Sequence, residues 1–347
     1  MEGKQIDNIL SIAEECIHHD ELVSLCAANI PLVAYDGFEP SGRIHIAQGI
    51  LRSINTNKLT SNGCKFKFWI ADWFAMLNLK YGGDLKKIKN AGLLMIETWK
   101  ACGMNMDNVE FIWSSEEINK DPGKYWGLVL DISTKFNLNR MLKCTQIMGR
   151  SESDDLAASQ IIYPIMQCAD IFFLNVNICS LGVDQRKVNM LAREYCDKIK
   201  RKHKPVILSH HMILGLKGED KMSKSDPDSA IYMDDAEADV NRKIKKSFCP
   251  PGIIEKNPIL EYCRYILFEK FKMITVHRKD EHGGSKDYNN YQDMEKDYVE
   301  NNLHPGDLKK SVAVYINQLL EPVRKYFNEN KDANKLRNLV KGYGKSK

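Results

Sequence analysis

The feature that most constrains the fold is an alternation of strand-like and helix-like segments in the first half of the chain. The runs at 32–38 and 65–72 have strand composition and are bounded by Gly, Pro and Asn, and 109–113 is a third short strand. Segments 45–59 and 84–103 between them have helical periodicity, and the second ends at a glycine. Because strands joined through helices pair in parallel with right-handed crossovers, this pattern predicts a doubly wound, Rossmann-type α/β domain.

The pattern changes beyond residue 234. The segments 241–248, 257–271, 289–302 and 307–330 are helical in periodicity, with loops at CPPG and HRKDEHGG. We therefore expect one domain over residues 1–234 and a second, mainly α-helical domain over 235–347. The KGYGKSK tail is expected to be disordered.

Composition narrows the class of protein without naming it. The length of 347 residues suits about two domains, and 43% hydrophobic with 28% charged residues is an ordinary globular mixture. A net charge of +4 permits an RNA partner without requiring one. The ten cysteines form no C-x-x-C pair, so we expect reduced, mostly buried thiols of a cytoplasmic protein and no zinc or redox centre.

The N-terminus and the hydropathy pattern argue against a membrane protein. The first 21 residues carry acids within an apolar pattern, which predicts an amphipathic helix rather than a signal peptide. No apolar run approaches the roughly 18 residues of a membrane span. We expect no membrane association.

The turn after the first strand, YDGFEPSGRIHIAQG, is the first candidate site. In a doubly wound sheet, ligands bind where a strand leads into a helix. Gly37 and Gly42 permit close backbone approach, and His45 falls at the start of the next helix, whose amino end attracts phosphate. Neither a Walker A loop nor a G-x-G-x-x-G fingerprint occurs here. A lone histidine at a helix start is more often structural, so catalysis stays open on this feature alone.

A second candidate is GEDKMSKSDPDSA, residues 218–230, where two lysines lie three residues apart among Ser, Gly, Asp and Pro. The ordinary interpretation of such a segment is a solvated surface loop.

Taken together, these motifs resemble a known family. P-S-G-R-I-H-I-A-Q-G resembles the HIGH signature of class I aminoacyl-tRNA synthetases, and K-M-S-K-S, about 175 residues later, matches their second signature. YDGFEPSG, YP-x-x-Q-x-x-D (163–170), GVDQRK (182–187) and HPGDLK (304–309) resemble tyrosyl-tRNA synthetases of the eukaryotic and archaeal branch. The resemblance implies a ligase of protein biosynthesis, which activates tyrosine with ATP to tyrosyl-adenylate and transfers the tyrosyl group to tRNA-Tyr.

The resemblance also implies a set of catalytic and ATP-binding residues. Two ammonium groups on a mobile loop can follow the negative charge that develops on the phosphoryl oxygens and the departing pyrophosphate. Gln48 stands where the first signature has its second histidine. Mg²⁺ is expected to accompany ATP from solution, without a dedicated metal site. The implied catalytic residues are His45, Gln48, Lys221, Ser223 and Lys224, and the implied ATP-binding residues are Gly37, Gly42, His45 and Lys224.

Amino-acid recognition is expected on the helix after Tyr163. Pro164 suits a first helical position, and residues 163, 167 and 170 are spaced i, i+4, i+7, which places them on one face. Asp170 lies in apolar company, so its carboxylate needs a partner, and a capping role or a buried ion pair is the alternative to substrate binding. The resemblance implies that Asp170 and Tyr35 bind the phenolic hydroxyl, while Tyr163, Gln167 and Gln185 surround the α-ammonium. Gln185 also suits ordinary packing.

The resemblance further implies contacts with tRNA and with a second copy of the chain. His304 and Asp307, with His282 nearby, would contact the first anticodon base, although Asp307 also suits a helix first turn and His304 a plain surface. An insertion at about 115–160 carries an apolar stripe that would form a homodimer interface or else pack in the core. The basic runs at 197–204 and 242–246 suit either the tRNA backbone or solvated helix faces.

Three other functions share part of this pattern. Tryptophanyl-tRNA synthetases have the same fold and both signatures, but Asp170 with Tyr35 argues against them. A non-catalytic RNA-binding relative would not need His45, Lys221 and Lys224. A nucleotidyltransferase with a similar histidine loop would leave the helical domain and HPGDLK unexplained.

Overall fold

The structure is a computed structural model that describes residues 2–28, 30–151, 154–220, 222 and 226–343. Its centre is a six-stranded sheet with the order β1-β6-β5-β2-β3-β4, in which neighbouring strands from β6 to β4 run parallel. The six strands are β1 (Glu15–Ile17), β2 (Leu32–Phe38), β3 (Cys64–Ile70), β4 (Val109–Trp113), β5 (Ile178–Cys179) and β6 (Val206–Ser209). The doubly wound α/β prediction is confirmed, and its first three strands lie within two residues of their predicted bounds.

The sheet reverses direction of growth at β2. The chain proceeds from β2 to β3 and β4 on one side, and later adds β5 and β6 on the other. The crossover from β2 to β3 runs through the π-helical turn η1 (Ala47–Leu51) and α3 (Arg52–Ser61), as the periodicity predicted. The crossover to β4 includes α4 (Asp72–Leu77), η2 (Lys80–Gly83) and α5 (Leu85–Ala101). A crevice opens at such a switch point, beyond the carboxyl ends of β2 and β5.

The prediction of one amphipathic helix at the N-terminus is wrong in part. The segment divides into α1 (Glu2–Leu10), β1 (Glu15–Ile17) and α2 (His19–Ala27). β1 pairs antiparallel with β6, and Glu14 N–H donates to Ser209 C=O at 2.8 Å. The unpaired backbone groups of β6 at the sheet edge satisfy those of residues 15–17, which outweighs their local helical pattern.

Between β4 and β6 the chain forms a helical layer over one face of the sheet, with its own cluster of buried apolar side chains. α7 packs against α9 in this layer. Its members are α6 (Ser114–Lys120), α7 (Pro122–Lys135), α8 (Leu138–Cys144), η3 (Thr145–Met148), α9 (Ala158–Phe173), η4 (Val183–Gln185) and α10 (Arg186–Lys198).

The prediction that Pro164 opens its helix is wrong. α9 begins at Ala158, where the Gln160 side chain accepts a hydrogen bond from the Ala157 N–H at 3.2 Å, and Pro164 lies inside the helix. Proline there removes one intrahelical hydrogen bond. The packing of α9 against α7 and α10 outweighs that loss.

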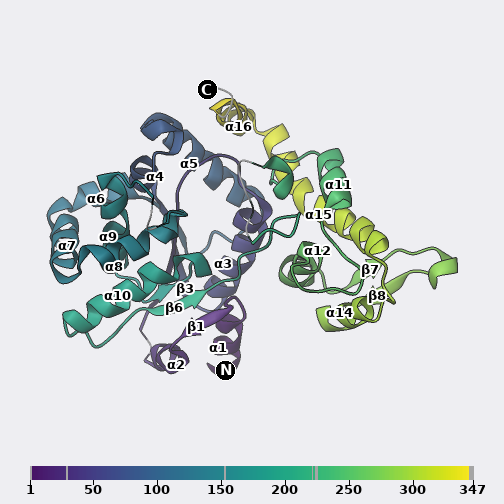
Figure 1. Cartoon of the computed structure of the whole chain (residues 1–347), viewed down its shortest axis with the longest axis horizontal. Coiled ribbons are helices and arrows are strands. Elements are labelled where there is room, and N and C mark those ends of the chain that lie inside the picture. The colour runs from purple at the N-terminus through teal and green to yellow at the C-terminus, as the bar shows by residue number, and fades with distance from the viewer. Residues whose placement is uncertain (1, 29, 152–153, 221, 223–225, 344–347) are drawn as a thin grey trace.

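The second half is mainly helical, as expected, and Figure 1 shows it beside the α/β body. A short antiparallel hairpin, which the sequence pattern did not indicate, is formed by β7 (Ile274–Val276) and β8 (Lys286–Tyr288). The expected disorder from residue 341 is wrong as far as 343, because α16 continues to Tyr343. The helices are α11 (Glu237–Lys246), α12 (Pro258–Tyr262), η6 (Cys263–Leu267), α13 (Phe268–Lys270), α14 (Tyr291–Val299), α15 (Pro305–Glu329) and α16 (Lys331–Tyr343).

The two halves are packed against each other. One cluster of buried apolar side chains runs from the sheet into α11, α12 and α15, and α16 packs on α5. Asn90 on α5 donates to the Tyr343 hydroxyl at 2.5 Å. The domain boundary at 234/235 stays a prediction, because the buried core is continuous across it.

Two sequence expectations concern chemistry outside the fold. All ten cysteines carry free thiols, and eight of them are buried, as expected for a reduced protein. None of the helices in the described ranges is long and apolar enough to cross a bilayer.

Candidate active site

A cavity of about 650 Å³ opens at the carboxyl ends of β2 and β5, where the topology predicts a ligand site. Its walls come from β2 and the turn after it, from α3, from α9, and from the segments 181–185 and 210–213. The cavity brings together most of the residues singled out in the sequence: Tyr35, Gly37, His45, Gln48, Tyr163, Gln167, Asp170 and Gln185.

The closed end of the cavity is formed by Tyr35 and Asp170, each 1% exposed. The Tyr35 hydroxyl has no hydrogen-bond partner among the described residues. Asp170 accepts a hydrogen bond from the Tyr125 hydroxyl of α7 at 2.8 Å. Burial raises the pKa of Asp170 well above its ordinary value, against the opposing effect of that hydrogen bond. This end therefore has a hydroxyl that is free to form a hydrogen bond beside a buried carboxyl group.

Tyr125 is a site residue that sequence reasoning missed. It supplies the partner that the apolar surroundings of Asp170 required, from 45 residues away in the chain. No local pattern around Tyr125 distinguishes it from other apolar positions of an amphipathic helix.

Polar side chains in the middle of the cavity hydrogen-bond to one another. The Tyr163 hydroxyl donates to the Glu39 carboxylate at 2.6 Å, and Asn78 Nδ2 donates to it at 3.0 Å. Gln167 Nε2 donates to Gln185 Oε1 at 3.0 Å. Glu39 lies inside the YDGFEPSG motif, but it was not among the residues expected to have a role. The signal that would have indicated it is an acidic residue in a turn that otherwise suits phosphate.

The open end of the cavity is built from the turn after β2. Gly42 has a φ of 110°, a conformation that favours glycine, while Gly37 lines the cavity. His45 pairs with Tyr232 in an isolated β-bridge, and the Gln48 carbonyl accepts a hydrogen bond from Trp99 Nε1 at 2.8 Å. Both residues therefore have a supported backbone at the cavity wall.

An ion-pair cluster ties this turn to the segment that follows the second signature. Arg43 contacts Asp234 at 2.5 Å and Asp235 at 2.8 Å, and Asp234 also contacts Lys341 at 2.6 Å. Backbone hydrogen bonds join residues 44 and 46 to 233 and 231. Arg43 was not among the residues expected from the sequence to have a role.

Four residues of the second signature, among them Lys221, Ser223 and Lys224, lie outside the described residues. Met222 between them is described, and its side chain lines the cavity. Their implied roles stay predictions.

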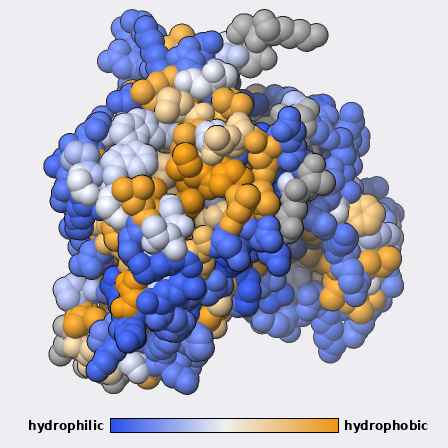
Figure 2. Space-filling view, turned by 60° about the vertical axis from the view of Figure 1, so that its left-hand side comes forward, coloured by the Kyte–Doolittle hydropathy of each residue, from blue (hydrophilic) through white to orange (hydrophobic). Residues whose placement is uncertain are grey.

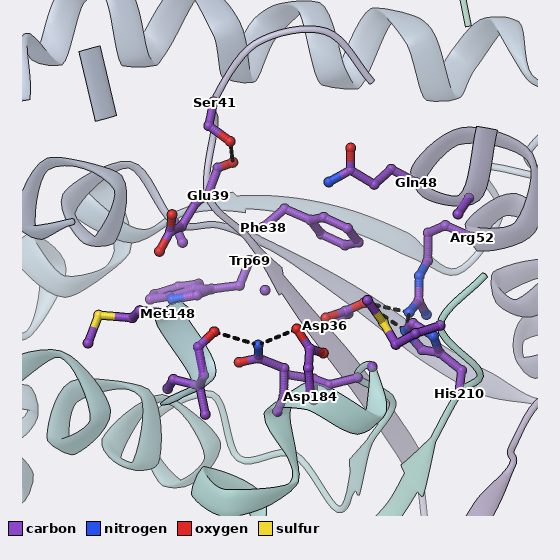
Figure 3. A pocket seen from close by; sticks show the side chains of 18 of the residues that line it. Asp36, Phe38, Glu39, Ser41, Gln48, Arg52, Trp69, Met148, Asp184 and His210 are labelled. Carbon is purple, nitrogen blue, oxygen red and sulfur yellow. Dashed lines mark hydrogen bonds and ion pairs between the residues drawn. The ribbon is translucent and has the colours of Figure 1, made fainter. Parts of the chain in front are cut away.

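A buried charged group forms the floor of the cavity beside Asp184, as Figure 3 shows. Arg52 pairs with Asp36 at 2.6 Å and also contacts the His210 ring. Burial, with the Arg52 guanidinium beside it, lowers the pKa of His210 below its ordinary value. None of these three residues was singled out in the sequence.

The residues assigned to tRNA recognition lie elsewhere. His304 caps α15, and its Nδ1 accepts the Gly306 N–H at 3.0 Å, while Asp307 lies in the first turn, 3.8 Å from Lys310. His282 ends the short turn η7 (Asp280–His282) between β7 and β8, and its side chain lies outside the description. Figure 1 shows this hairpin loop projecting on the side away from the sheet.

Similarity to known proteins extends over nearly the whole chain. The family described as tRNA synthetases class I (W and Y) matches residues 27–321. Tyrosine–tRNA ligase 1, cytoplasmic, of Arabidopsis thaliana is 58% identical over 341 residues, which are 98% of this chain and 89% of that protein.

Two solved structures have the same architecture. Leishmania major tyrosyl-tRNA synthetase in complex with tyrosinol is 47% identical with a TM-score of 0.95; the match covers 100% of this chain and 61% of that one. Tyrosyl-tRNA synthetase from Pyrococcus horikoshii, complexed with L-tyrosine, is 34% identical with a TM-score of 0.90, over 97% of this chain and 99% of that one. This chain thus spans less than two thirds of its Leishmania relative.

Proposed function

This chain belongs to the class I tRNA synthetases for tryptophan and tyrosine, and within them to the tyrosyl-tRNA synthetases; from that premise we propose that it charges tRNA-Tyr with tyrosine. In the first step a tyrosine carboxylate oxygen forms a bond to the α-phosphorus of ATP, and the bond to pyrophosphate breaks. In the second step a hydroxyl of the terminal tRNA adenosine attacks the tyrosyl carbonyl, and AMP leaves.

The observation that carries the proposal is the closed end of the cavity. A tyrosine ring entering it would place its hydroxyl between the idle Tyr35 hydroxyl and the Asp170 carboxyl. Phenylalanine would leave the Tyr35 hydroxyl without a partner and the Asp170 carboxyl with Tyr125 alone, and an unpaired buried polar group costs about 1–3 kcal/mol. The geometry therefore suits a phenol better than a benzyl or indole side chain.

The acceptors in the middle of the cavity suit the α-ammonium of tyrosine. Its three donors need acceptors, and the side chains of Tyr163, Gln167 and Gln185 lie around that position together with the Glu39 carboxylate. We add Glu39 to the amino-acid site because its carboxylate, which Lys80 also contacts at 3.3 Å, can accept hydrogen bonds from an ammonium.

The open end suits ATP. Gly37 and the turn at Gly42 allow close backbone approach to the nucleotide, and His45 and Gln48 would donate hydrogen bonds to the phosphates. Lys221, Ser223 and Lys224 would follow the charge that develops on the phosphoryl oxygens and the pyrophosphate. Mg²⁺ would arrive with ATP from solution. This assignment rests on the family resemblance and on the position of Met222.

The helical part would read the tRNA anticodon. His304 and Asp307 lie together at the start of α15, and the His282 loop projects nearby on the hairpin. A carboxylate can accept the amino or imino proton of a base, which gives direct readout. The alternative, in which both residues only begin the helix, fits the same contacts, so the anticodon assignment depends on the test given below.

A homodimer is the assembly that the surface suits best. Trp126 and Leu130 on α7, Leu138 on α8 and Ile162 on α9 are exposed, Leu130 to 65%. Figure 2 shows apolar side chains gathered on this face of the molecule. An exposed apolar patch of this kind marks an interaction site. We also propose a cytoplasmic location, which the name of the Arabidopsis relative supports.

The test is amino-acid-dependent ATP–pyrophosphate exchange across the twenty amino acids. We expect exchange with tyrosine and none above background with phenylalanine or tryptophan. Exchange that depends on tryptophan, or no exchange with any amino acid, would overturn the proposal. Charging of tRNA-Tyr in the same preparation checks the second step.

A further inference from the structure

A second cavity of about 560 Å³ lies beside the candidate active site and shares α3 as a wall. Its walls are the loop at 11–14, α3, the end of η6 with α13, and residues 289–292 at the start of α14. Leu51, Asn55 and His211 line both cavities. The volume is within the 300–1,000 Å³ that small-molecule sites commonly have.

Some cationic side chains of this cavity have carboxylate partners, and one has none among the described residues. Lys58 pairs with Glu269 at 2.8 Å, and the His211 ring lies between the carboxylates of Glu14 and Glu261, at 3.1 and 3.0 Å. Arg264 makes no ion pair within the described part of the chain. Arg264 is therefore the one cation of the cavity wall, in that part, without a carboxylate partner.

The side chain of Arg264 is exposed and packs against two aromatic rings. Its guanidinium lies over the rings of Tyr265 and Tyr291, 5.1 and 5.6 Å from the two centroids. Beside it, residues 290–292 form the cap and first turn of the nine-residue helix α14, and the Asn290 side chain accepts the Asp293 N–H at 2.9 Å. A guanidinium and a helix amino end on one wall together favour a bound anion.

An independent observation points to a ligand with polar edges. Asn55 on α3 is only 4% exposed, yet its side-chain amide makes no hydrogen bond to any described residue, and it reaches the cavity wall. The two donors and one acceptor group of this amide suit the edge of a nucleobase. The amides of Asn289 and Gln292 line the same space.

We propose that this second cavity binds a nucleoside monophosphate. The phosphate would lie on Arg264 and the amino end of α14, and the base would hydrogen-bond to Asn55. One unpaired cation matches one phosphate group, and the described wall offers no second unpaired cation for a di- or triphosphate, because Lys58 is paired with Glu269 and His211 with Glu14. This site is separate from the cavity assigned to ATP and tyrosine, with which it shares a wall.

Calorimetric titration tests the inference. The first cavity is filled with a non-hydrolysable tyrosyl-adenylate analogue, whose own binding is measured beforehand, and AMP, GMP, CMP, UMP and inorganic phosphate are then titrated separately. We expect at least one nucleotide to bind one-to-one and at least tenfold more tightly than phosphate. Absence of binding by all four nucleotides, or equal affinity for phosphate, would overturn the proposal.

Variants locate the binding. Arg264→Gln should weaken the nucleotide at least tenfold, and Arg264→Lys should weaken it less, because a lysine keeps the charge but loses the planar fork. Lys325→Gln is the matched control, since Lys325 lies on α15 outside the cavity and loses the same charge. Equal affinity in Arg264→Gln and wild type would place the nucleotide elsewhere. Arg264 lines the second cavity and not the first, so a lower nucleotide affinity in Arg264→Gln reports on the second cavity even if the analogue does not fill the first.

Discussion

The two ends of the active-site cavity are built in opposite ways. The closed end consists of side chains from β2, α7 and α9, nearly all buried, whose polar groups are placed before any ligand arrives. The open end consists of turns and loop flanks that are tied together by ion pairs such as Arg43 with Asp234. Choosing a side chain requires rigid, dry groups, whereas stabilising a moving charge requires groups that adjust to it.

The largest effect is expected at the open end. Lys224→Ala should raise the barrier to adenylate formation by about 2.7–4 kcal/mol, because an ammonium group that meets the developing charge is lost, while tyrosine affinity stays nearly unchanged. Single-turnover kinetics with separate tyrosine titration measures both. Lys202→Ala, at an exposed lysine, is the control. A loss confined to tyrosine binding would contradict the assignment of adenylate formation to the open end and of tyrosine recognition to the closed end.

Asp170→Ala tests the closed end. The substitution should lower kcat/KM for tyrosine by an amount that corresponds to about 1–3 kcal/mol of activation free energy, because the phenol loses its acceptor. It should also remove the preference for tyrosine over phenylalanine. Competition of the two amino acids in the exchange assay measures the ratio. Tyr125→Phe is the matched control, since it removes a donor to Asp170 but keeps the acceptor. An unchanged Tyr/Phe ratio in Asp170→Ala would refute the assignment.

Asp307→Ala extends the comparison to a surface far along the chain from the cavity. Tyrosine-dependent ATP–pyrophosphate exchange should be intact. The kcat/KM for charging of tRNA-Tyr should fall by an amount that corresponds to about 1–2 kcal/mol, and discrimination between bases at the first anticodon position should decrease. Both half-reactions are measured on wild-type and anticodon-mutant tRNA. Equal losses on every tRNA, or a parallel loss in exchange, would show that Asp307 only begins α15.

Arg43→Ala should weaken the open end without touching the closed one. Loss of the contacts to Asp234 and Asp235 loosens the turn before His45, and we expect about a tenfold rise in KM for ATP, with KM for tyrosine unchanged. Lys341→Ala, which removes only the outer contact to Asp234, should have a smaller effect. Parallel rises in both KM values would mean that Arg43 supports the whole cavity.

The smallest expected effect is on the free energy of unfolding. Its dependence on pH reports on Asp170 at the closed end of the cavity. The pKa of Asp170 is raised in the folded state, so folding holds its proton more tightly than the unfolded chain does. The favourable contribution is complete below the unfolded pKa and declines as pH rises toward the folded one. Asp170→Asn should therefore gain stability relative to wild type between pH 5 and pH 8. Urea unfolding at both values measures the difference, and a constant difference would contradict the prediction.

Periodicity and motif position in the sequence agree well with the structure. Residues 32–38 and 109–113 form strands with the predicted bounds, and the residues quoted from three motifs line one cavity. Parallel strands all present their carboxyl ends at one edge, so motifs that follow strands converge there without further information. The domain boundary, the homodimer and the roles of the signature lysines stay predictions.

The sequence by itself determined the fold class, the family and many of the residues that line the cavity, because strand and helix periods are local and the motifs follow strand ends. Only the tertiary structure decided the partners of those residues. Tyr125 reaches Asp170, Arg43 reaches Asp234, and residues 15–17 leave their helical pattern to pair with β6. Each of these contacts joins distant segments, and its energy depends on burial and on a partner's geometry that no local window of sequence contains.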